Sequence, residues 1–460
     1  MGEVDRRVVL LVVTLTSFLT PFASSSFNIA LPSISKEFNL DAITMSWASL
    51  AYLLASAMFL VPFGRLADIH GRRKVFLYGT ISFTIASTLL GIYPSAMTII
   101  WLRALQGVSS AMIFGTGVAI LVSVTPLKEK GAILGINAAT VYVGLSIGPF
   151  IGGLITETFG WRSILFVTAG IGAVAVLFMV WRLKGEWREA IGESFDLRGA
   201  IVYSMMLLSL MYGFSLIPST SSILPILLGL AAGGIFVWVE ARAEHPVLDI
   251  NLFRSNRAFT FSNLAALINF SATYAVTFLM SLYLQYIKGL DPEKAGLILI
   301  ASPIVQAVFS PIAGRLSDRT EPRKVAAIGM AITMFGLIPF VFLNEQTNVL
   351  IVVASLVALG FGLSVFSSPN TNAIMSSVEK RLYGVASSTL GTMRLTGQML
   401  SLGITMIIFA VFIGRVEVVP EVYSALTGSI NIAFIVFSGL CLMGILASLV
   451  DSRESKPTQS

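Results

Sequence analysis

The chain has 460 residues, of which 55% are hydrophobic and 12% carry a charge, whereas about a quarter of the residues are charged in an ordinary soluble domain. This composition excludes a soluble globular protein and predicts an integral membrane protein. The single cysteine, Cys441, lies in an apolar run, so a disulfide framework is excluded as well.

Apolar windows of about twenty residues, long enough to cross a hydrocarbon core of about 30 Å, occur fourteen times along the chain. The first window is too long for a signal sequence and is expected to remain as the first span. The windows fall near 8–32, 45–65, 75–94, 98–123, 132–156, 162–183, 197–217, 222–241, 258–285, 294–314, 324–343, 348–373, 384–414 and 428–449.

An even number of spans places both termini on the same side of the membrane. Of the 30 Lys and Arg residues, 23 lie in segments on that side, five lie on the other side and two lie within spans. Because short cytoplasmic loops are enriched in Lys and Arg, we predict a multi-pass protein of the cell membrane with both termini in the cytoplasm. The net charge of +6 is then mainly a topology signal and does not indicate an acidic partner.

A charge-dense segment between the second and third spans occurs twice. Residues 64–74 read GRLADIHGRRK, and residues 314–324, at an offset of 250, read GRLSDRTEPRK. Glycine allows a tight turn, aspartate can accept backbone N–H groups at a helix start, and the cations remain in water on one side of the bilayer. The chain is therefore expected to be a doubled unit.

The repeat predicts an all-α membrane fold with two pseudo-symmetric six-helix bundles around a central path. If spans 1–6 correspond to spans 9–14, the pair of spans near 197–241 is additional, and we expect it to pack at the periphery. The predicted domains are an N-terminal bundle at 1–188, a linker with two additional transmembrane helices at 189–247, and a C-terminal bundle with a short tail at 248–460.

The first copy of the repeated loop resembles the pattern G-x-L-x-D-x-x-G-R-[RK] of the major facilitator superfamily, while the second departs from it at Glu321 and Pro322. Residues 28–32, 156–162 and 245–254 are similar to the fourteen-span drug/proton antiporter branch. The resemblance implies secondary active transport by alternating access, with the loop latching the cytoplasmic side. A basic turn that only sets topology is the alternative. The residues so assigned to gating are Gly64, Asp68, Gly71, Arg72, Arg73, Gly314, Asp318 and Arg323.

The fifth span contains a stretch similar to the antiporter signature G-x-x-x-G-P-x-x-G-G. Its residues are Gly144, Gly148, Pro149, Gly152 and Gly153. Glycines four apart share one helical face and let a neighbouring backbone come close, and a proline invites a bend. The resemblance implies a contact between the halves, and simple tight helix packing is the alternative.

Two arginines lie within spans. Arg103 belongs to an R-x-x-Q-G element with Gln106, and Arg394 lies near mid-membrane. Because an arginine there costs about 2.5–3.5 kcal/mol on insertion scales, each is a candidate for substrate binding or coupling. The alternative for each is an arginine that only locks neighbouring helices together.

Antiporters of this branch typically have an aspartate five residues before the asparagine of N-x-A-L-P, and this chain has Ala23 there. This departure puts proton coupling through a buried carboxylate in doubt. Two hypotheses follow: the path prefers neutral or anionic solutes to organic cations, and any proton coupling uses Glu157, Glu37, Asp68 or the substrate itself.

Polar residues on the spans expected to line the path are the remaining candidates for substrate binding or coupling. A single residue of this kind more often only forms a hydrogen bond to a neighbouring helix. Those with the strongest claim are Asn28, Asn137, Tyr142, Asn269, Tyr274, Asn370 and Gln398; the others are Ser24, Ser25, Ser26, Tyr52, Gln306 and Asn372.

Motifs for phosphate cradling, metal clusters or a nucleophile elbow are missing from the sequence, which argues against an enzyme or an ATP-driven pump. We expect no cofactor, metal or nucleic acid partner. The expected partners are a small-molecule substrate, the lipid bilayer and, as a candidate coupling ion, the proton, and a monomer is expected.

The leading interpretation is a transporter that exports small amphipathic compounds. The alternatives are a carrier for a specific organic anion or metabolite, and a non-transporting receptor or scaffold on the same fold.

Overall fold

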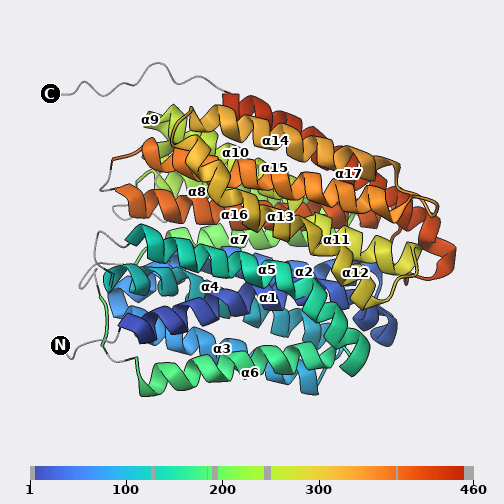
Figure 1. The fold of residues 1–460 in the computed structure, drawn as a ribbon, viewed down its shortest axis with the longest axis horizontal. Coiled ribbons are helices and arrows are strands. Elements are labelled where there is room, and N and C mark those ends of the chain that lie inside the picture. The colour runs from blue at the N-terminus through green and yellow to red at the C-terminus, as the bar shows by residue number, and fades with distance from the viewer. Residues whose placement is uncertain are drawn as a thin grey trace.

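The computed structural model describes residues 6–125, 130–183, 185–188, 195–242, 250–379 and 382–449. These residues form a bundle of long helices that run roughly side by side along one axis (Figure 1). Fourteen helical segments in the described part of the chain are long and apolar enough to cross a membrane. The prediction of an all-α protein with fourteen spans is thereby confirmed.

The first six spans form the N-terminal half and are each a single helix. They are α1 (Arg6–Phe38), α2 (Ala42–His70), α3 (Arg72–Ile92), α4 (Ala96–Ser123), α5 (Lys130–Phe159) and α6 (Arg162–Trp181).

Spans of the C-terminal half are more often broken into shorter helices. They are α10 (Arg257–Thr273) with α11 (Ala275–Leu282) and the π-helical turn η3 (Tyr283–Ile287), α12 (Pro292–Leu299) with α13 (Ala301–Ser317), α14 (Pro322–Leu337) with η4 (Ile338–Phe342), α15 (Val349–Ser376), α16 (Tyr383–Phe412), and η6 (Pro420–Val422) with α17 (Tyr423–Leu449). The short helix α9 (Ile250–Ser255) precedes α10.

The two halves pack their helices in the same pattern. In the N-terminal half, α2 and α3 pack on α4, α1 packs on α5, and α3 packs on α6. The C-terminal half has the matching pairs, because α13 and α14 pack on α15, α10 packs on α16, and α14 packs on α17. The doubling seen in the loop sequence thus extends to the packing of whole helices.

Local sequence accounts for several helix starts and one break. Asp41 caps α2 by accepting from the backbone N–H groups of Ile43 and Thr44, each at 2.9 Å. Asp291 caps α12 and also binds Lys294, and this ammonium holds the pKa of the Asp291 carboxyl below its ordinary value. The break between α10 and α11 is stabilised from a neighbouring helix, since the Ala275 N–H donates to the hydroxyl of Ser401 at 3.0 Å.

The additional pair of spans consists of α7 (Leu197–Ser215) and α8 (Ile223–Glu240), joined by the turn η2 (Thr220–Ser222). As expected, α8 lies at the periphery and exposes a row of leucines. The helix α7 is also peripheral, with Ile201, Met205 and Leu208 exposed, but it packs on α2 of one half and on α16 of the other. The Tyr203 hydroxyl lies 3.4 Å from that of Thr396, and the Ser204 hydroxyl donates to the Met58 carbonyl at 3.5 Å. The helix α7 therefore lies along a seam between the halves.

The bundle has two ends. We call the end where α1 begins and α17 ends the termini end, and the opposite end, where α1 meets α2, the distal end (Figure 1). The predicted domain boundary at 188/189 lies at the edge of the described residues, and the boundary at 247/248 and the motif residues 245–249 lie outside them.

Candidate functional site

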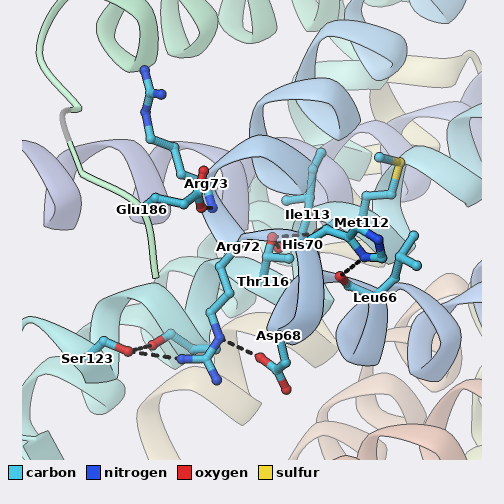
Figure 2. Close-up of polar contacts among 11 residues, drawn as sticks. Leu66, Asp68, His70, Arg72, Arg73, Met112, Ile113, Thr116, Ser123 and Glu186 are labelled. Atoms are coloured by element: carbon cyan, nitrogen blue, oxygen red, sulfur yellow. Dashed lines mark hydrogen bonds and ion pairs between the residues drawn. The ribbon is translucent and has the colours of Figure 1, made fainter. Parts of the chain in front are cut away.

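The first copy of the repeated loop joins α2 to α3 at the termini end, around an ion pair. Arg72, in the first turn of α3, donates from Nε to Asp68 Oδ1 at 2.7 Å and from Nη1 to Ser123 Oγ at 3.0 Å (Figure 2). The Arg72 side chain is 8% exposed and that of Asp68 is 30% exposed, so water screens the pair only in part. The ion pair therefore connects the α2–α3 junction to the end of α4.

A residue outside the motif completes this junction. Glu186, in the segment after α6, accepts from the backbone N–H of Arg73 at 2.8 Å (Figure 2). The Trp187 carbonyl accepts from the N–H of Arg72 at 3.0 Å. A side chain at Gly71 would collide with Glu186, because a Cβ there would lie 2.5 Å from the carboxyl carbon. Gly71 also has a φ of +122°, which favours glycine.

Sequence reasoning did not identify Glu186. The available signal was its place as an acidic residue between two cations, Lys184 and Arg188, directly after the sixth span. Such a carboxylate is suited to accept from the unbonded N–H groups at the start of a helix.

The second copy, between α13 and α14, has different contacts. Asp318 accepts from the side-chain amide of Asn372 on α15 at 3.2 Å, and the same amide donates to Ser317 at 3.0 Å. Pro322 begins α14, and Lys324 forms an exposed ion pair with Glu321. Gly314 faces Ser368 of α15. This copy is thus connected to α15 through an amide, whereas the first copy is connected to α4 through a guanidinium.

The glycine-rich stretch of α5 has two faces. Gly144, Gly148 and Gly152 face α1, where a Cβ at Gly144 would lie 2.7 Å from the Phe18 carbonyl oxygen and one at Gly152 would lie 2.6 Å from Ser26 Cβ. The other face meets the C-terminal half. Gly153 lies against the backbone of Pro292, and Gly296 of α12 lies against the backbone of Pro149. The stretch is therefore placed both for tight packing inside one half and for contact between the halves.

Side-chain hydrogen bonds join α1 to the C-terminal half from mid-helix to the distal end. Hydroxyls of Ser24 and Tyr274 lie 3.1 Å apart. Further along α1, Ser281, Gln285 and Tyr286 donate to the carbonyls of Asn28, Ile29 and Pro32 at 3.1, 2.9 and 3.3 Å. A backbone bridge between Asp41 and Glu417 adds a contact at the distal end. The halves are thus held together at this end.

Arg103 is hydrogen-bonded and packed against aromatic rings inside the N-terminal half. Its guanidinium donates to the Ala48 carbonyl at 3.2 Å and to Gln106 Oε1 at 2.9 Å, and the Gln106 amide donates to Ser87 at 2.8 Å. The ring centroids of Phe27 and Tyr52 lie 4.3 and 4.5 Å from the guanidinium carbon. With 1% of its surface exposed, Arg103 has the contacts expected of a residue that holds helices together.

Arg394 has different surroundings. It is half-buried on α16, and its guanidinium carbon lies 5.8 Å from the ring centroid of Phe270 on α10. Within the described residues, Arg394 has neither a hydrogen bond nor an ion pair. Gln398, one turn further on the same face, is half-buried too. Arg103 lies against the ring of Tyr52 on α2, and α16, which carries Arg394, packs on both α2 and α10, the helix that ends just before Tyr274, so these four residues lie around one central region.

The remaining polar candidates divide into groups. Asn28 accepts from Ser49 at 2.8 Å, Asn137 accepts from Ser17 at 2.7 Å, and Asn269 donates to Met330 Sδ at 3.0 Å, so these three bond to neighbours within their own halves. Asn370 is buried and Tyr142 is half-buried. The structure therefore brings Tyr274 together with Ser24 and Asn28, and it places Arg394 and Gln398 on α16, which packs on α10. Asn137 is left as a packing residue, and Asn269 keeps a buried side-chain oxygen without a hydrogen-bond partner among the described residues.

Carboxylates lie at the ends of the spans. Ala23 occupies the mid-membrane position on α1 at which the resembled branch has an aspartate. Glu37, at the distal end of α1, accepts from Trp161 Nε1 at 2.8 Å and is ion-paired with Arg162. In the described part of the chain, no group of three His, Cys, Asp or Glu side chains is placed to hold a metal ion.

Comparison with known families decides the identity of the fold. The model of the Major Facilitator Superfamily matches residues 13–401 and 262–460. The chain belongs to this superfamily. It is a multi-pass secondary transporter and not an enzyme.

Two curated relatives and one solved structure illustrate the similarity. The riboflavin transporter RibZ of Clostridioides difficile is 28% identical over 458 residues, which are 98% of each chain. The multidrug resistance protein Stp of Mycobacterium tuberculosis is 31% identical over 377 residues, which are 80% of this chain and 70% of Stp. A bacterial homolog of the human lysosomal transporter Spinster, in an inward-facing and unoccupied conformation, shares the fold with a TM-score of 0.74 at 16% identity, covering 99% of each chain.

Proposed function

We propose that the protein exports small amphipathic organic compounds across the cytoplasmic membrane by alternating access, with the termini end in the cytoplasm. The observation that carries the proposal is the polar region between the halves, where half-buried Tyr274 at the end of α10 lies beside Ser24 of α1, and α16, which carries half-buried Arg394 and Gln398, packs on α10 and on α2. In a doubled membrane fold, a polar region at the interface of the repeats is the expected place for a solute. The multidrug resistance protein Stp, at 31% identity, supports a drug-like cargo.

A carrier for one specific metabolite is the second candidate. It is supported by the riboflavin transporter RibZ, which aligns with 98% of this chain. The two candidates make different demands on the central region. A promiscuous exporter needs an adaptable apolar wall, while a specific carrier needs several polar groups that a single solute satisfies together.

Alternating access requires that the distal contacts open. This step would separate α1 from α11 and η3 and break the four side-chain hydrogen bonds that begin at Ser24 and end at Pro32. Since each neutral hydrogen bond contributes about 0.5–1.5 kcal/mol, their total is small enough for contacts made elsewhere to offset it. The close backbone contact between Gly153 and Pro292 is a candidate pivot for the rocking of the halves.

We propose that energy coupling does not use a mid-membrane carboxylate, because Ala23 occupies the position at which antiporters of the fourteen-span branch have an aspartate. If protons drive transport, the remaining carriers are the carboxylates at span ends, Glu37, Glu157 and Asp68, or the solute itself. Glu37 and Asp68 are ion-paired with Arg162 and Arg72. Exchange of solutes or facilitated diffusion requires no such group.

Purified full-length protein in liposomes tests the proposal. Riboflavin, fluorescein and rhodamine 123 would be offered with imposed pH and voltage gradients, and we expect flux of at least one of them above protein-free vesicles. A Gly153→Leu variant should lose most of this flux, because its side chain would push α5 away from α12. The matched control is Gly170→Leu on α6, where nothing lies within 4 Å of the added Cβ.

Three outcomes of this assay distinguish the exporter, the specific carrier and a receptor that does not transport. Flux of several unrelated probes supports the exporter, and flux of one probe alone supports the specific carrier. Saturable binding with no flux under any gradient would favour a receptor or scaffold and would contradict the proposal. We further propose that the functional unit is a monomer, which light scattering of the purified protein would check.

A further inference from the structure

An arginine inside a membrane protein needs partners. Burying a guanidinium without hydrogen-bond acceptors is costly, so intramembrane arginines normally bind carbonyls, hydroxyls or carboxylates. Arg103 follows this rule with one carbonyl, one amide oxygen and two aromatic faces. Arg394 does not, since the ring of Phe270 is its only neighbour of this kind among the described residues.

The position of Arg394 excludes the simplest external partner. It is the twelfth of the 30 residues of α16, so about 16 Å of helix separates it from the helix start at the termini end. A lipid phosphate at that surface is too far away for an arginine side chain to reach. The contact with Phe270 on α10, and the packing of α16 against α10 and α2, place the guanidinium inside the protein and not toward the acyl chains.

The groups around Arg394 have a common character. Gln398 offers a side-chain amide on the same helical face, and Tyr274 offers a hydroxyl that is shared with Ser24 of the other half. Phe270 and Tyr274, both half-buried, add aromatic surface beside these polar groups. No Asp or Glu of the chain lies in the middle of a span, so nothing at this depth carries a negative charge. The region thus combines one cation that has no hydrogen bond or ion pair to the described residues, two neutral polar groups and aromatic surface.

We propose that Arg394 binds a negatively charged group of the transported solute, so that the protein selects aromatic solutes with an anionic group over cationic ones. This inference rests on the proposed transport function and specifies its substrate class. A carboxylate, sulfonate or phosphate would accept two N–H donors of the guanidinium, and Gln398 would donate to the same anion. The aromatic body of the solute would pack against Phe270 and Tyr274.

The same geometry explains why an organic cation is a poor ligand. A cation in this region would meet the positive charge of Arg394 without a carboxylate to neutralise it. Arg103 adds a second positive charge from the N-terminal half. Specificity would therefore arise from repulsion of cations as well as from attraction of anions.

A matched pair of dyes tests the proposal. Fluorescein and rhodamine 123 share a xanthene ring, but fluorescein is anionic at neutral pH and rhodamine 123 is cationic. Binding would be measured by fluorescence anisotropy on the purified full-length protein, and uptake would be measured in proteoliposomes. We expect fluorescein to bind at least about tenfold more tightly than rhodamine 123, as one charge-assisted hydrogen bond would produce.

Variants of Arg394 carry the decisive comparison. Arg394→Gln should weaken fluorescein binding about tenfold to a hundredfold and leave rhodamine 123 binding unchanged or stronger. Arg394→Lys should restore part of the loss, because it keeps the charge without the planar pair of donors. The matched control is Arg182→Gln, which removes an exposed arginine at the end of α6 and should bind both dyes like the unchanged protein.

The outcomes separate this inference from the transport function. Equal or tighter binding of rhodamine 123, or an Arg394→Gln variant that binds fluorescein as Arg182→Gln does, would overturn the anionic selectivity. If riboflavin or rhodamine 123 were nevertheless transported, the proposed transport function would stand and only this inference would fail. If fluorescein, rhodamine 123 and riboflavin neither bound nor moved, both would fail. Monodisperse elution of each variant in size-exclusion chromatography controls for misfolding.

Discussion

The two copies of the repeated loop have similar sequences and different contacts. In the first copy, Asp68 is ion-paired with a nearly buried Arg72, whose guanidinium also reaches Ser123 of α4. In the second, Asp318 accepts one amide hydrogen bond from Asn372 of α15. The difference shows that a repeat can keep the position of an aspartate while its partner changes. It also indicates that the first copy is the stronger junction, and three sets of substitutions test that ranking.

The largest effect is expected at Gly71. Gly71→Val would place a β-branched residue at a φ of +122° and push its side chain into Glu186. Such backbone strain alone costs about 1–3 kcal/mol, so we expect a clear fall in the thermal unfolding midpoint of the purified protein. The corresponding position of the second copy is Glu321, where Glu321→Val should change the midpoint little, because that residue is exposed. Equal effects at the two positions would contradict the ranking.

A smaller effect is expected from the aspartates. Asp68→Asn removes the charge that Arg72 binds, and a charge-assisted hydrogen bond contributes about 1.5–3 kcal/mol, less the part that water screens at a partly exposed carboxylate. Asp318→Asn keeps an acceptor for Asn372 and should cost less than about 0.5 kcal/mol. Thermal unfolding and solute flux would be measured on both variants. If Asp318→Asn were the more damaging, the second copy would be the stronger junction.

Among the three positions of the first junction, the smallest effect is expected at Glu186. Glu186→Ala removes an acceptor from the N–H of Arg73, and loss of such a helix cap costs about 1 kcal/mol. Glu186→Gln should retain most of the stability, because its side-chain oxygen can still accept. Increased exchange of the Arg72 and Arg73 amide protons in Glu186→Ala would show that the segment after α6 holds the start of α3. Unchanged exchange would mean that the Trp187 carbonyl is sufficient.

The number of spans and their doubled arrangement could be predicted from the sequence. Apolar length follows directly from the thickness of the bilayer, and the loops at 64–74 and 314–324 mark the repeat. The contact of α7 with both halves could not be predicted. A helix that faces lipid and a helix that faces protein are both apolar in a membrane, so hydropathy does not distinguish α7 from α8.

The candidate site was predictable in its residue types and not in its partners. Arg103 and Arg394 look alike in the sequence, as single cations within apolar spans. Only the folded chain shows that Ala48 and Gln106 satisfy the first, while the second faces a ring and two neutral polar side chains. Glu186 was missed for a similar reason, since its contact with Arg73 joins residues 113 positions apart.

The position of α7 limits the routes by which a hydrophobic solute could enter from within the bilayer. By lying along α2 and α16, with Tyr203 beside Thr396 and Ser204 beside Met58, it covers that flank against acyl chains. A lateral doorway would then have to open on the opposite flank, where α5 meets α12 and α13. A solute dissolved in the membrane would then reach the central region from one flank of the helical bundle only, and the lipids next to that flank would affect how readily it enters.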